Sequence, residues 1–319
     1  MTAAMLTAAG VPATAAGNIG TPVLDLLDEP VPGAYVVELS SFQLDRSDTV
    51  PARAAALLNI SEDHLDWHGS VEAYRRAKLR ILERAAVAVV PHALAGAVPD
   101  GPARVIRFGL DAPAAGDFGI VREDGRDWFS AGKRRLLAVD AAFSPAPHNQ
   151  LNALAALALV DAFGADTAAA AQALTCFEPL PHRGARVRVL DGVTYVDDSK
   201  ATNVGAALAS IRAVAGPVVL VAGGDAKGAD LTPLAAALSG RVRAVVALGA
   251  AAGALDDALH GTAPVERADD MNDAVARARR RASSGDTVLL APACASTDMF
   301  ANYRERGEAF VRAVAGLGS

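Results

Sequence analysis

The segment VTYVDDSKATNVGAALASIRAVAGPVVLVAGG (residues 193–224) contains two patterns that together indicate a fold class. Residues 193–198 form a short apolar run ending in two aspartates, which is typical of a strand. Residues 203–214 have the spacing of a helix, and residues 217–224 form a second apolar strand ending in paired glycines. A strand, a helix and a second strand in this order predict a parallel sheet covered by helices.

The same alternation extends over most of the chain. The clearest elements upstream are buried strands at 34–39, 54–60 and 85–90, an amphipathic helix at 70–85, and helices at 1–10 and 148–164. Residues 103–143 consist of short alternating pieces with Gly and Asp turns, which predict a small antiparallel patch. A turn-rich stretch at 177–186 separates this series from the second one. We therefore predict an α/β protein with a boundary near residue 180.

Length, charge and cysteine content limit the class of protein. A chain of 319 residues suits two domains, and a formal charge of −6 argues against a nucleic-acid binder. Cys176 and Cys294 lie far apart, so we expect neither a disulfide framework nor a zinc site, and a cytoplasmic setting. No charged residue precedes Asp25, but the start lacks a basic region, and the apolar run 151–160 is too short to span a bilayer. We expect no membrane segment.

Lysine is rare in this chain. Of the 30 basic residues, the lysines are only Lys78, Lys133, Lys200 and Lys227. Where arginine is the usual cation, a lysine suggests a need for a compact ammonium group or a nucleophilic amine. Lys133, in the turn-rich AGKRRLL, is interpreted as an ordinary surface residue.

Polar residues follow five of the predicted strands, and ligands in open α/β sheets bind beyond the carboxyl ends of strands. Glu38 and His64 at two such ends could share a hard cation such as Mg²⁺; alternatively, Glu38 caps a turn and His64 is a surface residue. Lys78 lies in a helix among arginines, where a solvated face is the simpler interpretation.

Two further strand ends lie in the second half. VAGGDAKGAD (221–230) places Gly223, Gly224 and Lys227 just after a strand, and LLAPACASTDMF (289–300) places Ser296 in the same way. Paired glycines permit close approach of a ligand to the backbone, but a tight turn explains them almost as well.

Nine motifs in this chain occur in the order typical of one enzyme family. They are GNIG (17–20), ELSSFQL (38–44), NISEDHLDWHG (59–69), YRRAKLRI (74–81), HNQLNALAA (148–156), LPHR (180–183), DDSKATN (197–203), GGDAKGAD (223–230) and PACASTDMF (292–300). This series resembles the Mur ligases over nearly the whole chain. DDSKATN, GGDAKGAD and PACAS resemble the branch that adds D-glutamate; branches that add other amino acids carry different sequences there.

The resemblance implies a fold and an activity. Residues 1–179 would form the central ATPase domain, a mostly parallel sheet with a small antiparallel patch, and residues 180–319 a Rossmann-like amino-acid-binding domain. The implied reaction is ATP- and Mg²⁺-dependent joining of D-glutamate to UDP-N-acetylmuramoyl-L-alanine through an acyl phosphate, in peptidoglycan precursor synthesis. A cytoplasmic monomer is implied as well.

The resemblance also implies roles for single residues. The catalytic magnesium ligands would be Glu38, His64 and a carbamylated Lys78; arginine cannot be carbamylated, which would explain a lysine among arginines. The ATP contacts would be His148, Asn149, Asn152, Arg183 and Asp198. The muramoyl substrate would meet Asn18, Ser40 and Gln43, and D-glutamate would meet Lys200, Thr202, Lys227, Ser296 and Tyr303. Relatives usually have phenylalanine in place of Tyr303.

One part of the family pattern is absent from the sequence. The phosphate-binding loop of the form G-T-N-G-K-[ST]-T would precede the uncapped helix at 1–10, and the UDP-binding domain would precede that loop. We therefore expect a truncated ligase that uses ATP poorly or not at all. The alternatives are a non-catalytic remnant that binds D-glutamate or docks to a partner, and another amino-acid ligase of the same superfamily.

Overall fold

The computed structural model describes residues 1–61, 63–144 and 146–318, and the chain packs as two compact units. Unit 1 comprises Met1–Ile60 and Glu72–Glu178, and unit 2 comprises Ser61–Val71 and Pro179–Ser319. These units are defined by packing. The functional division into an ATPase domain (1–179) and an amino-acid-binding domain (180–319) remains a prediction.

Unit 1 contains two sheets. The larger has the order β3-β4-β5-β6-β7-β8, with β3 to β6 parallel and β6 to β8 antiparallel. Its strands are β3 (Ala52–Ala56), β4 (Ala85–Pro91), β5 (Arg104–Phe108), β6 (Phe118–Glu123), β7 (Arg126–Ala131) and β8 (Arg134–Ala138). The smaller sheet pairs β1 (Ala13–Gly17) with β2 (Ala34–Glu38) in parallel. The mostly parallel architecture with a small antiparallel patch is as predicted.

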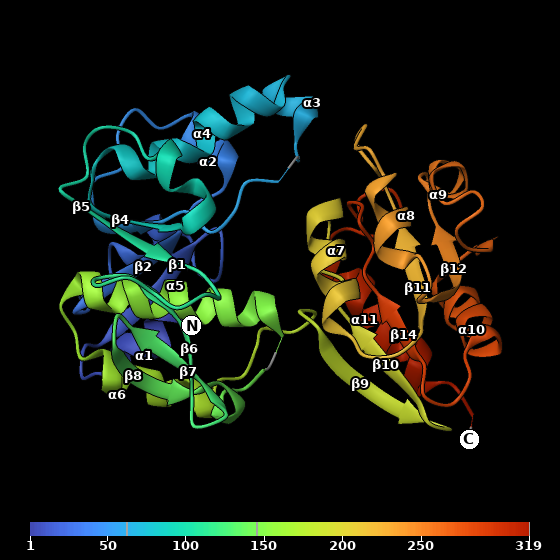
Figure 1. The fold of residues 1–319 in the computed structure, drawn as a ribbon. Helices are drawn as coiled ribbons and strands as arrows, with labels where there is room; N and C mark the ends of the chain where they lie inside the picture. Colours follow the sequence, from blue (N-terminus) through green and yellow to red (C-terminus); the bar gives the residue numbers. More distant parts are fainter. Residues whose placement is uncertain (62, 145, 319) are drawn as a thin grey trace. The chain divides into compact units, whose positions relative to one another are not determined.

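The predicted helices of unit 1 are present as α1 (Thr2–Ala8), α4 (Val71–Glu83) and α5 (Pro147–Phe163), together with short helices that were not predicted (Figure 1). The short helices are α2 (Ser41–Asp45), α6 (Thr167–Gln172) and the 3-10 helices η1 (Val23–Leu26), η2 (His92–Ala97), η3 (Val139–Ala141) and η4 (Ala173–Thr175). The helix α4 begins at the last residue of the segment 61–71 assigned to unit 2 and continues in unit 1.

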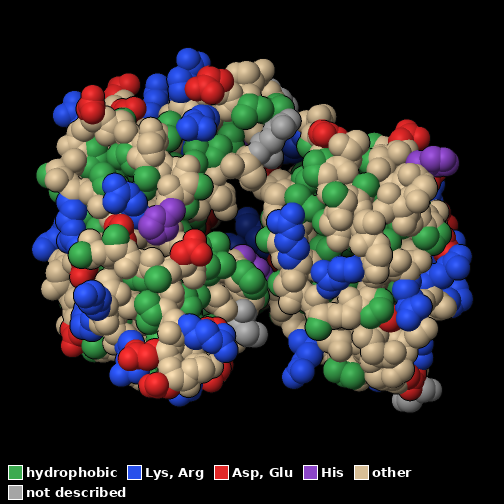
Figure 2. All heavy atoms as spheres, viewed as in Figure 1, with side chains coloured by type: hydrophobic (Ala, Val, Ile, Leu, Met, Phe, Trp, Pro, Cys, Tyr) green, Lys and Arg blue, Asp and Glu red, His purple; other side chains and the backbone are tan. Residues whose placement is uncertain are grey.

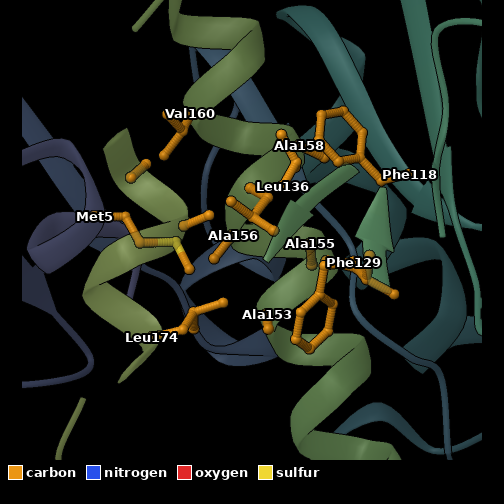
Figure 3. Packing of buried hydrophobic residues seen from close by; sticks show 14 of the residues in the cluster. Met5, Phe118, Phe129, Leu136, Ala153, Ala155, Ala156, Ala158, Val160 and Leu174 are labelled. Atoms are coloured by element: carbon orange, nitrogen blue, oxygen red, sulfur yellow. The ribbon is translucent and has the colours of Figure 1, made fainter. Parts of the chain in front are cut away.

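The helix α5 lies at the centre of the unit 1 core. Its residues from Ala153 to Ala158 are all buried, so the helix is apolar on every side, as expected of a helix surrounded by protein. Met5, Phe118 and Phe129 pack into the same cluster from three other elements (Figure 3). The many alanines of α5 let these large side chains approach its backbone closely.

Several details of unit 1 differ from expectation. Residues 104–110 were assigned to the antiparallel patch, but β5 pairs in parallel with β4, because the connection at 92–103 is long enough for a crossover. The antiparallel patch consists of the hairpins β6–β7 and β7–β8, and the first of them turns at Asp124 and Gly125, which both have positive φ, as a two-residue hairpin turn requires. The strand expected at 54–60 ends at Ala56, although the next residue is still buried.

The interpretation of residues 34–39 as a buried strand is wrong. Only Ala34 of β2 is buried. Its sheet has just two strands, and although α1 packs against it, Tyr35 and Val37 remain exposed. The strand β1 was not predicted at all, since its alanine-rich run resembles the preceding helix.

Unit 2 is a three-layer α/β structure. Its sheet has the order β13-β12-β11-β14-β10-β9, and every pair is parallel except β10 with β9. The strands are β9 (Ala185–Leu190), β10 (Val193–Asp197), β11 (Val218–Gly223), β12 (Val242–Leu248), β13 (Val265–Arg267) and β14 (Thr287–Leu290). This is the Rossmann-like arrangement predicted. The edge strand β9 was not expected, because its arginines obscure the apolar pattern.

Helices cover both faces of this sheet (Figure 1). One face packs against α7 (Val204–Ala213), α8 (Pro233–Leu238) and α9 (Ala252–Ala258), and the other against α10 (Met271–Arg281) and α11 (Tyr303–Ala315). Successive side chains of β11 enter the two clusters alternately, which is why its sequence is a continuous apolar run. A further short helix, α3 (Leu65–His68), lies in the segment 61–71.

The surface of unit 1 mixes charges of both signs. In Figure 2, acidic and basic side chains are interspersed on the face shown. None of the helices described is both long and apolar enough to cross a membrane.

Removing Leu154 is expected to destabilise the core of unit 1. Its side chain is fully buried in α5, so Leu154→Ala should lower the free energy of unfolding by about 2–5 kcal/mol. Urea denaturation measures the change. The control is Leu110→Ala, which truncates a leucine that is 38% exposed and should cost much less. Equal losses for the two variants would contradict the assignment of α5 as the core helix.

Candidate active site

The residues predicted to meet D-glutamate follow three adjacent strands of unit 2. The loops after β10, β14 and β11 carry Lys200 with Thr202, Ser296, and Lys227, respectively. These strands are neighbours in the order β11-β14-β10 and run parallel, so their carboxyl ends lie at one edge of the sheet.

Backbone hydrogen bonds tie the three loops together. Asp225 and Ala295 exchange two bonds of 3.0 and 2.9 Å, and the amide of Ala293 donates to the carbonyl of Ala201 at 2.9 Å. Ala293 has a φ of 59°, which is uncommon for a residue with a side chain and shows that the surrounding bonds hold this conformation.

The paired glycines are required by protein packing. A Cβ at Gly223 would overlap the carbonyl oxygen of Leu248, and one at Gly224 would overlap that of Ala295. Both glycines also have positive φ. The close approach is therefore between neighbouring backbone segments. Gly249, on the facing loop, is similarly confined by the carboxylate of Asp298.

Thr202, Lys227 and His64 line one small cavity of about 40 Å³ in unit 2. Asp63 borders it too and organises its wall: Oδ2 accepts a hydrogen bond from Asn203 Nδ2 at 2.8 Å, and Oδ1 accepts one from the His64 amide at 2.9 Å. A space of this size holds about one water molecule.

A larger hollow of about 980 Å³ lies in unit 1, at the amino ends of β3 and β4. It is bordered by Arg53, Glu83, Arg84 and Asp100 among others, and none of the predicted site residues lines it. Ligands of open α/β sheets bind beyond the carboxyl ends of the strands, whereas this hollow lies at the amino ends of β3 and β4. Its size alone therefore does not identify it as the site.

The ammonium group of Lys200 lies over an aromatic ring. Its Nζ is 4.3 Å from the centroid of the Tyr303 ring, so the two residues predicted to meet D-glutamate are in direct cation–π contact. The Tyr303 hydroxyl accepts a long hydrogen bond, 3.4 Å, from Arg304 Nε. The contact with Lys200 uses only the ring, so a phenylalanine would also provide it.

The structure places Arg183 within electrostatic reach of Asp198. Burial raises the pKa of the Asp198 carboxyl; a hydrogen bond from Ser210 opposes this, the charge of Asp197 adds to it, and Arg183 opposes it. Arg183 itself is exposed. These two residues were both predicted to reach ATP; their proximity is compatible with that role, which remains a prediction.

Two buried polar pairs beside the site were not predicted. His182 Nδ1 lies 2.6 Å from Asp197 Oδ2, and the same aspartate accepts a bond from the Ser199 amide through Oδ1. The guanidinium of Arg306 lies beneath Ser199. The doubled aspartate at 197–198 was the sequence signal for the first pair, because one of two adjacent carboxylates at a strand end often accepts hydrogen bonds from the backbone.

In unit 1, Glu38 ends β2 and is held by Asn18. The Asn18 side chain donates to Glu38 Oε1 at 2.9 Å, and its amide donates to the Glu38 carbonyl at 2.8 Å. Ser40 and Gln43 form a capping box at the start of α2, each satisfying the other's backbone. The cap gives both residues a structural role, and their contact with a substrate remains a prediction.

The remaining predicted residues lie on two helices. Lys78 is half-buried on α4, with its Nζ 5.3 Å from the centroid of the Tyr74 ring, so it is not on a fully solvated face. His148 and Asn149 lie in the first turn of α5, and Asn152 follows on an exposed position. Burial lowers the pKa of His148. Asn149 donates to Ser144 Oγ at 3.0 Å.

The donor chemistry at the predicted metal ligands suits Mg²⁺ in kind. Glu38 presents an exposed carboxylate at a strand end, and Asn18 orients it. Among the described residues, however, no three His, Cys, Asp or Glu side chains are grouped closely enough to hold a metal ion. Glu38 and Lys78 belong to unit 1 and His64 to unit 2, so their metal role remains a prediction.

Comparison with known proteins places the chain in a family. Residues 2–160 match the Mur ligase middle domain, and residues 182–294 match the domain described as Mur ligase, glutamate ligase domain. The UDP-N-acetylmuramoylalanine--D-glutamate ligase of Chromohalobacter salexigens is 47% identical over 300 residues, covering 92% of this chain and 66% of that protein. The chain belongs to the Mur ligase family. The resemblance predicted from its motifs is thus confirmed.

Further relatives agree with this assignment. The enzyme of the same name from Methylobacillus flagellatus is 46% identical over 315 residues, which is 97% of this chain and 69% of that protein. The chain therefore spans about two thirds of the length of these Mur ligase relatives. In fold, it resembles the MurF ligase from Thermotoga maritima solved in complex with ADP, with a TM-score of 0.69 at 19% identity, covering 98% of this chain and 77% of that one.

Neutralising Asp198 is expected to stabilise the fold. Its pKa is raised on folding, so the protonated form adds stability below the ordinary value of about 3.9, and this stability is lost as pH rises through the folded pKa. Asp198→Asn should therefore raise the urea midpoint at neutral pH, and the gain should shrink below pH about 4. Asp256→Asn, at an exposed aspartate of α9, is the matched control. A loss of stability at neutral pH would contradict the burial argument.

Proposed function

We propose that this chain carries the ATP-using and amino-acid-binding parts of a ligase that joins D-glutamate to UDP-N-acetylmuramoyl-L-alanine. The two Mur ligase relatives from Chromohalobacter salexigens and Methylobacillus flagellatus described above bear the name of this activity. The structural observation that supports it best is the shared edge of the unit 2 sheet, where the loops of Lys200, Lys227 and Ser296 meet.

The chemistry of this edge suits a small dicarboxylate. Lys200 and Lys227 supply two ammonium groups, and a charge-assisted hydrogen bond to a carboxylate is roughly twice as strong as a neutral one. Thr202 lines the same cavity as Lys227 and offers a hydroxyl. The carbonyl of Ser296 accepts hydrogen bonds from the amides of Met299 and Phe300 at 3.1 and 2.8 Å, so its backbone is held by protein contacts.

The reaction requires charge neutralisation and positioning. The γ-phosphoryl group of ATP is transferred to the alanyl carboxylate, giving ADP and an acyl phosphate, and the amine of D-glutamate then displaces phosphate to leave an amide. Arg183 would lie against the phosphates, and His148, Asn149 and Asn152 near the base. Asp198 would accept hydrogen bonds from the nucleotide. Such positioned groups commonly contribute most of the rate enhancement in phosphoryl transfer.

Magnesium would be held by Glu38, His64 and, if carbamylated, Lys78, and would supply positive charge opposite the phosphates. Asn18 would keep the Glu38 carboxylate in a fixed orientation, as its hydrogen bond does in the structure. Conversion of the Lys78 ammonium to a carbamate would change a cation into an oxygen ligand.

Phosphate release tests the activity. The assay contains UDP-N-acetylmuramoyl-L-alanine, ATP, Mg²⁺ and D-glutamate, and it uses two proteins: the 319-residue chain, and the chain preceded by any residues that its gene encodes upstream. We expect release that depends on D-glutamate in at least one of them, with L-glutamate and meso-diaminopimelate inactive. Release that responds to another amino acid would indicate a different ligase. Binding of D-glutamate without release in either protein would indicate a non-catalytic binder.

Carbamylation of Lys78 is tested by substitution and rescue. In whichever protein is active, Lys78→Ala should lower kcat by about 10²-fold or more, the scale for removing one group that stabilises transition-state charge. Acetate or formate should restore part of the rate, because a free carboxylate can occupy the vacated position. Lys133→Ala, at an exposed lysine of the β7–β8 turn, is the control and should be unaffected. Full activity of Lys78→Ala would rule out the ligand role.

A further inference from the structure

The guanidinium of Arg306 is the most fully bonded buried cation in the described part of unit 2. The residue lies on α11 and is only 2% exposed. Its Nε donates to Ser199 Oγ at 3.0 Å and one terminal nitrogen to the Ser199 carbonyl at 3.0 Å. The other terminal nitrogen donates to three carbonyls, those of Gly223, Cys294 and Ala295, at 3.3, 3.1 and 3.3 Å.

These acceptors belong to the three loops that carry the proposed D-glutamate residues. Ser199 precedes Lys200 after β10, Gly223 ends β11 before Lys227, and Cys294 and Ala295 precede Ser296 after β14. The carbonyl oxygens of Gly223, Cys294 and Ala295, which come from two of the loops, converge on one nitrogen, and their partial negative charges repel one another. Ser199, in the third loop, bonds to the other two nitrogens of the same guanidinium. A cation at this point is therefore what lets the three loops approach so closely.

Gly224 and Ser199 are also constrained by contacts with the Arg306 guanidinium. At Gly224, a Cβ would lie 3.2 Å from the Arg306 terminal nitrogen as well as overlapping the Ala295 carbonyl. The Ser199 hydroxyl, which accepts from Arg306, donates in turn to the Tyr303 carbonyl at 2.8 Å. Arg306 is thus connected to the first turn of its own helix, where Tyr303 contacts Lys200.

The charge of Arg306 persists despite its burial. The pKa of the guanidinium is lowered to about 10, because burial lowers it more than the surrounding Cys294, Asp298 and Asp197 raise it. The group is therefore still protonated near neutral pH. Lysine keeps the charge, but its ammonium is a single point with three N–H groups and cannot reach acceptors spread over three loops.

We propose that Arg306 is a positioning residue that sets the relative placement of Lys200, Lys227 and Ser296 for binding D-glutamate. The inference rests on the proposed function, since D-glutamate is the ligand of that function. Arg306 lies beneath the loops and does not itself contact the ligand in the proposed role. It acts through the backbone of the loops, and its loss separates them.

The test compares Arg306→Lys with Arg312→Lys, the same substitution at an exposed position of the same helix. D-glutamate binding to the 319-residue chain is measured by calorimetry, and hydrogen exchange is measured on amides 199–203, 223–228 and 293–297. In Arg306→Lys we expect Kd to rise about tenfold or more, the scale on which a small misplacement acts, and those amides to exchange about tenfold faster while the other strands stay protected. Arg312→Lys should change neither.

A second variant addresses the case in which Arg306→Lys does not fold. Ser199→Ala removes one acceptor of Arg306 and the link to Tyr303 and keeps the other four bonds. It should raise Kd by a smaller factor, about threefold, and quicken exchange at 199–203 alone. Exchange and Kd unchanged in a folded Arg306→Lys, or in Ser199→Ala if the first variant is unfolded, would overturn the proposal. If the wild-type 319-residue chain does not bind D-glutamate, binding is measured on the protein extended by the upstream residues of its gene. Absence of binding in both proteins contradicts the proposed function, and the exchange measurement still decides whether Arg306 places the loops.

Discussion

The carboxyl edge of the parallel sheet in unit 2 is the constraint on which the rest of the candidate site depends. In a parallel sheet every strand ends at the same edge, so the loops after β10, β14 and β11 must crowd together there. Their carbonyl groups have no further strand to pair with, and water reaches them poorly. The chain resolves this by bonding the loops to one another and by placing the Arg306 guanidinium among the carbonyls that remain.

This solution differs from that of unit 1, where the polar residues lie near the surface. Glu38 and Asn152 are exposed, and Ser40 is satisfied by a local capping box. In unit 2, by contrast, Asp197, Ser199 and Arg306 are all nearly inaccessible to water. A buried polar network gives a unique geometry only if each member finds its partners, and here the acceptors and donors are matched. The unit 2 loops are accordingly held in place by protein contacts alone, an arrangement that suits the proposed binding of a small, flexible amino acid.

The sequence predicted the fold where apolar periodicity was strong. The runs at β4, β11 and β14 and the helices α4, α5 and α7 were all recognised, because burial on both faces of a sheet leaves a clear signal. The strands β1 and β9 were missed for opposite reasons. The first is alanine-rich and resembles a helix, and the second alternates arginine with valine at a sheet edge. The direction of β5 depended on the length of a connection, which composition does not reveal.

The site was predicted unevenly, because motifs report residues and not their partners. The motif DDSKATN identified Lys200 and Thr202, but nothing in it distinguishes Asp197, which serves His182 and the backbone, from the half-buried Asp198. Likewise, the glycine pair at 223–224 was read as a turn or a ligand approach. The structure shows that it accommodates neighbouring carbonyls. Such roles depend on partner residues that are distant in the sequence, so they could not be predicted from the local motifs of a single sequence.

The uneven use of lysine and arginine follows from the same geometry. Arg306 must satisfy acceptors on three loops at once, and only a planar group with five N–H donors spans them. Lys200 has a different arrangement: its ammonium rests over the Tyr303 ring, and a cation–π contact holds a cation without using its N–H groups as donors. A cation held in this way can turn to an incoming carboxylate or, for a lysine, react at its nitrogen. A guanidinium anchored by five bonds can do neither, which agrees with the proposal that Arg306 positions the loops and Lys200 meets the ligand.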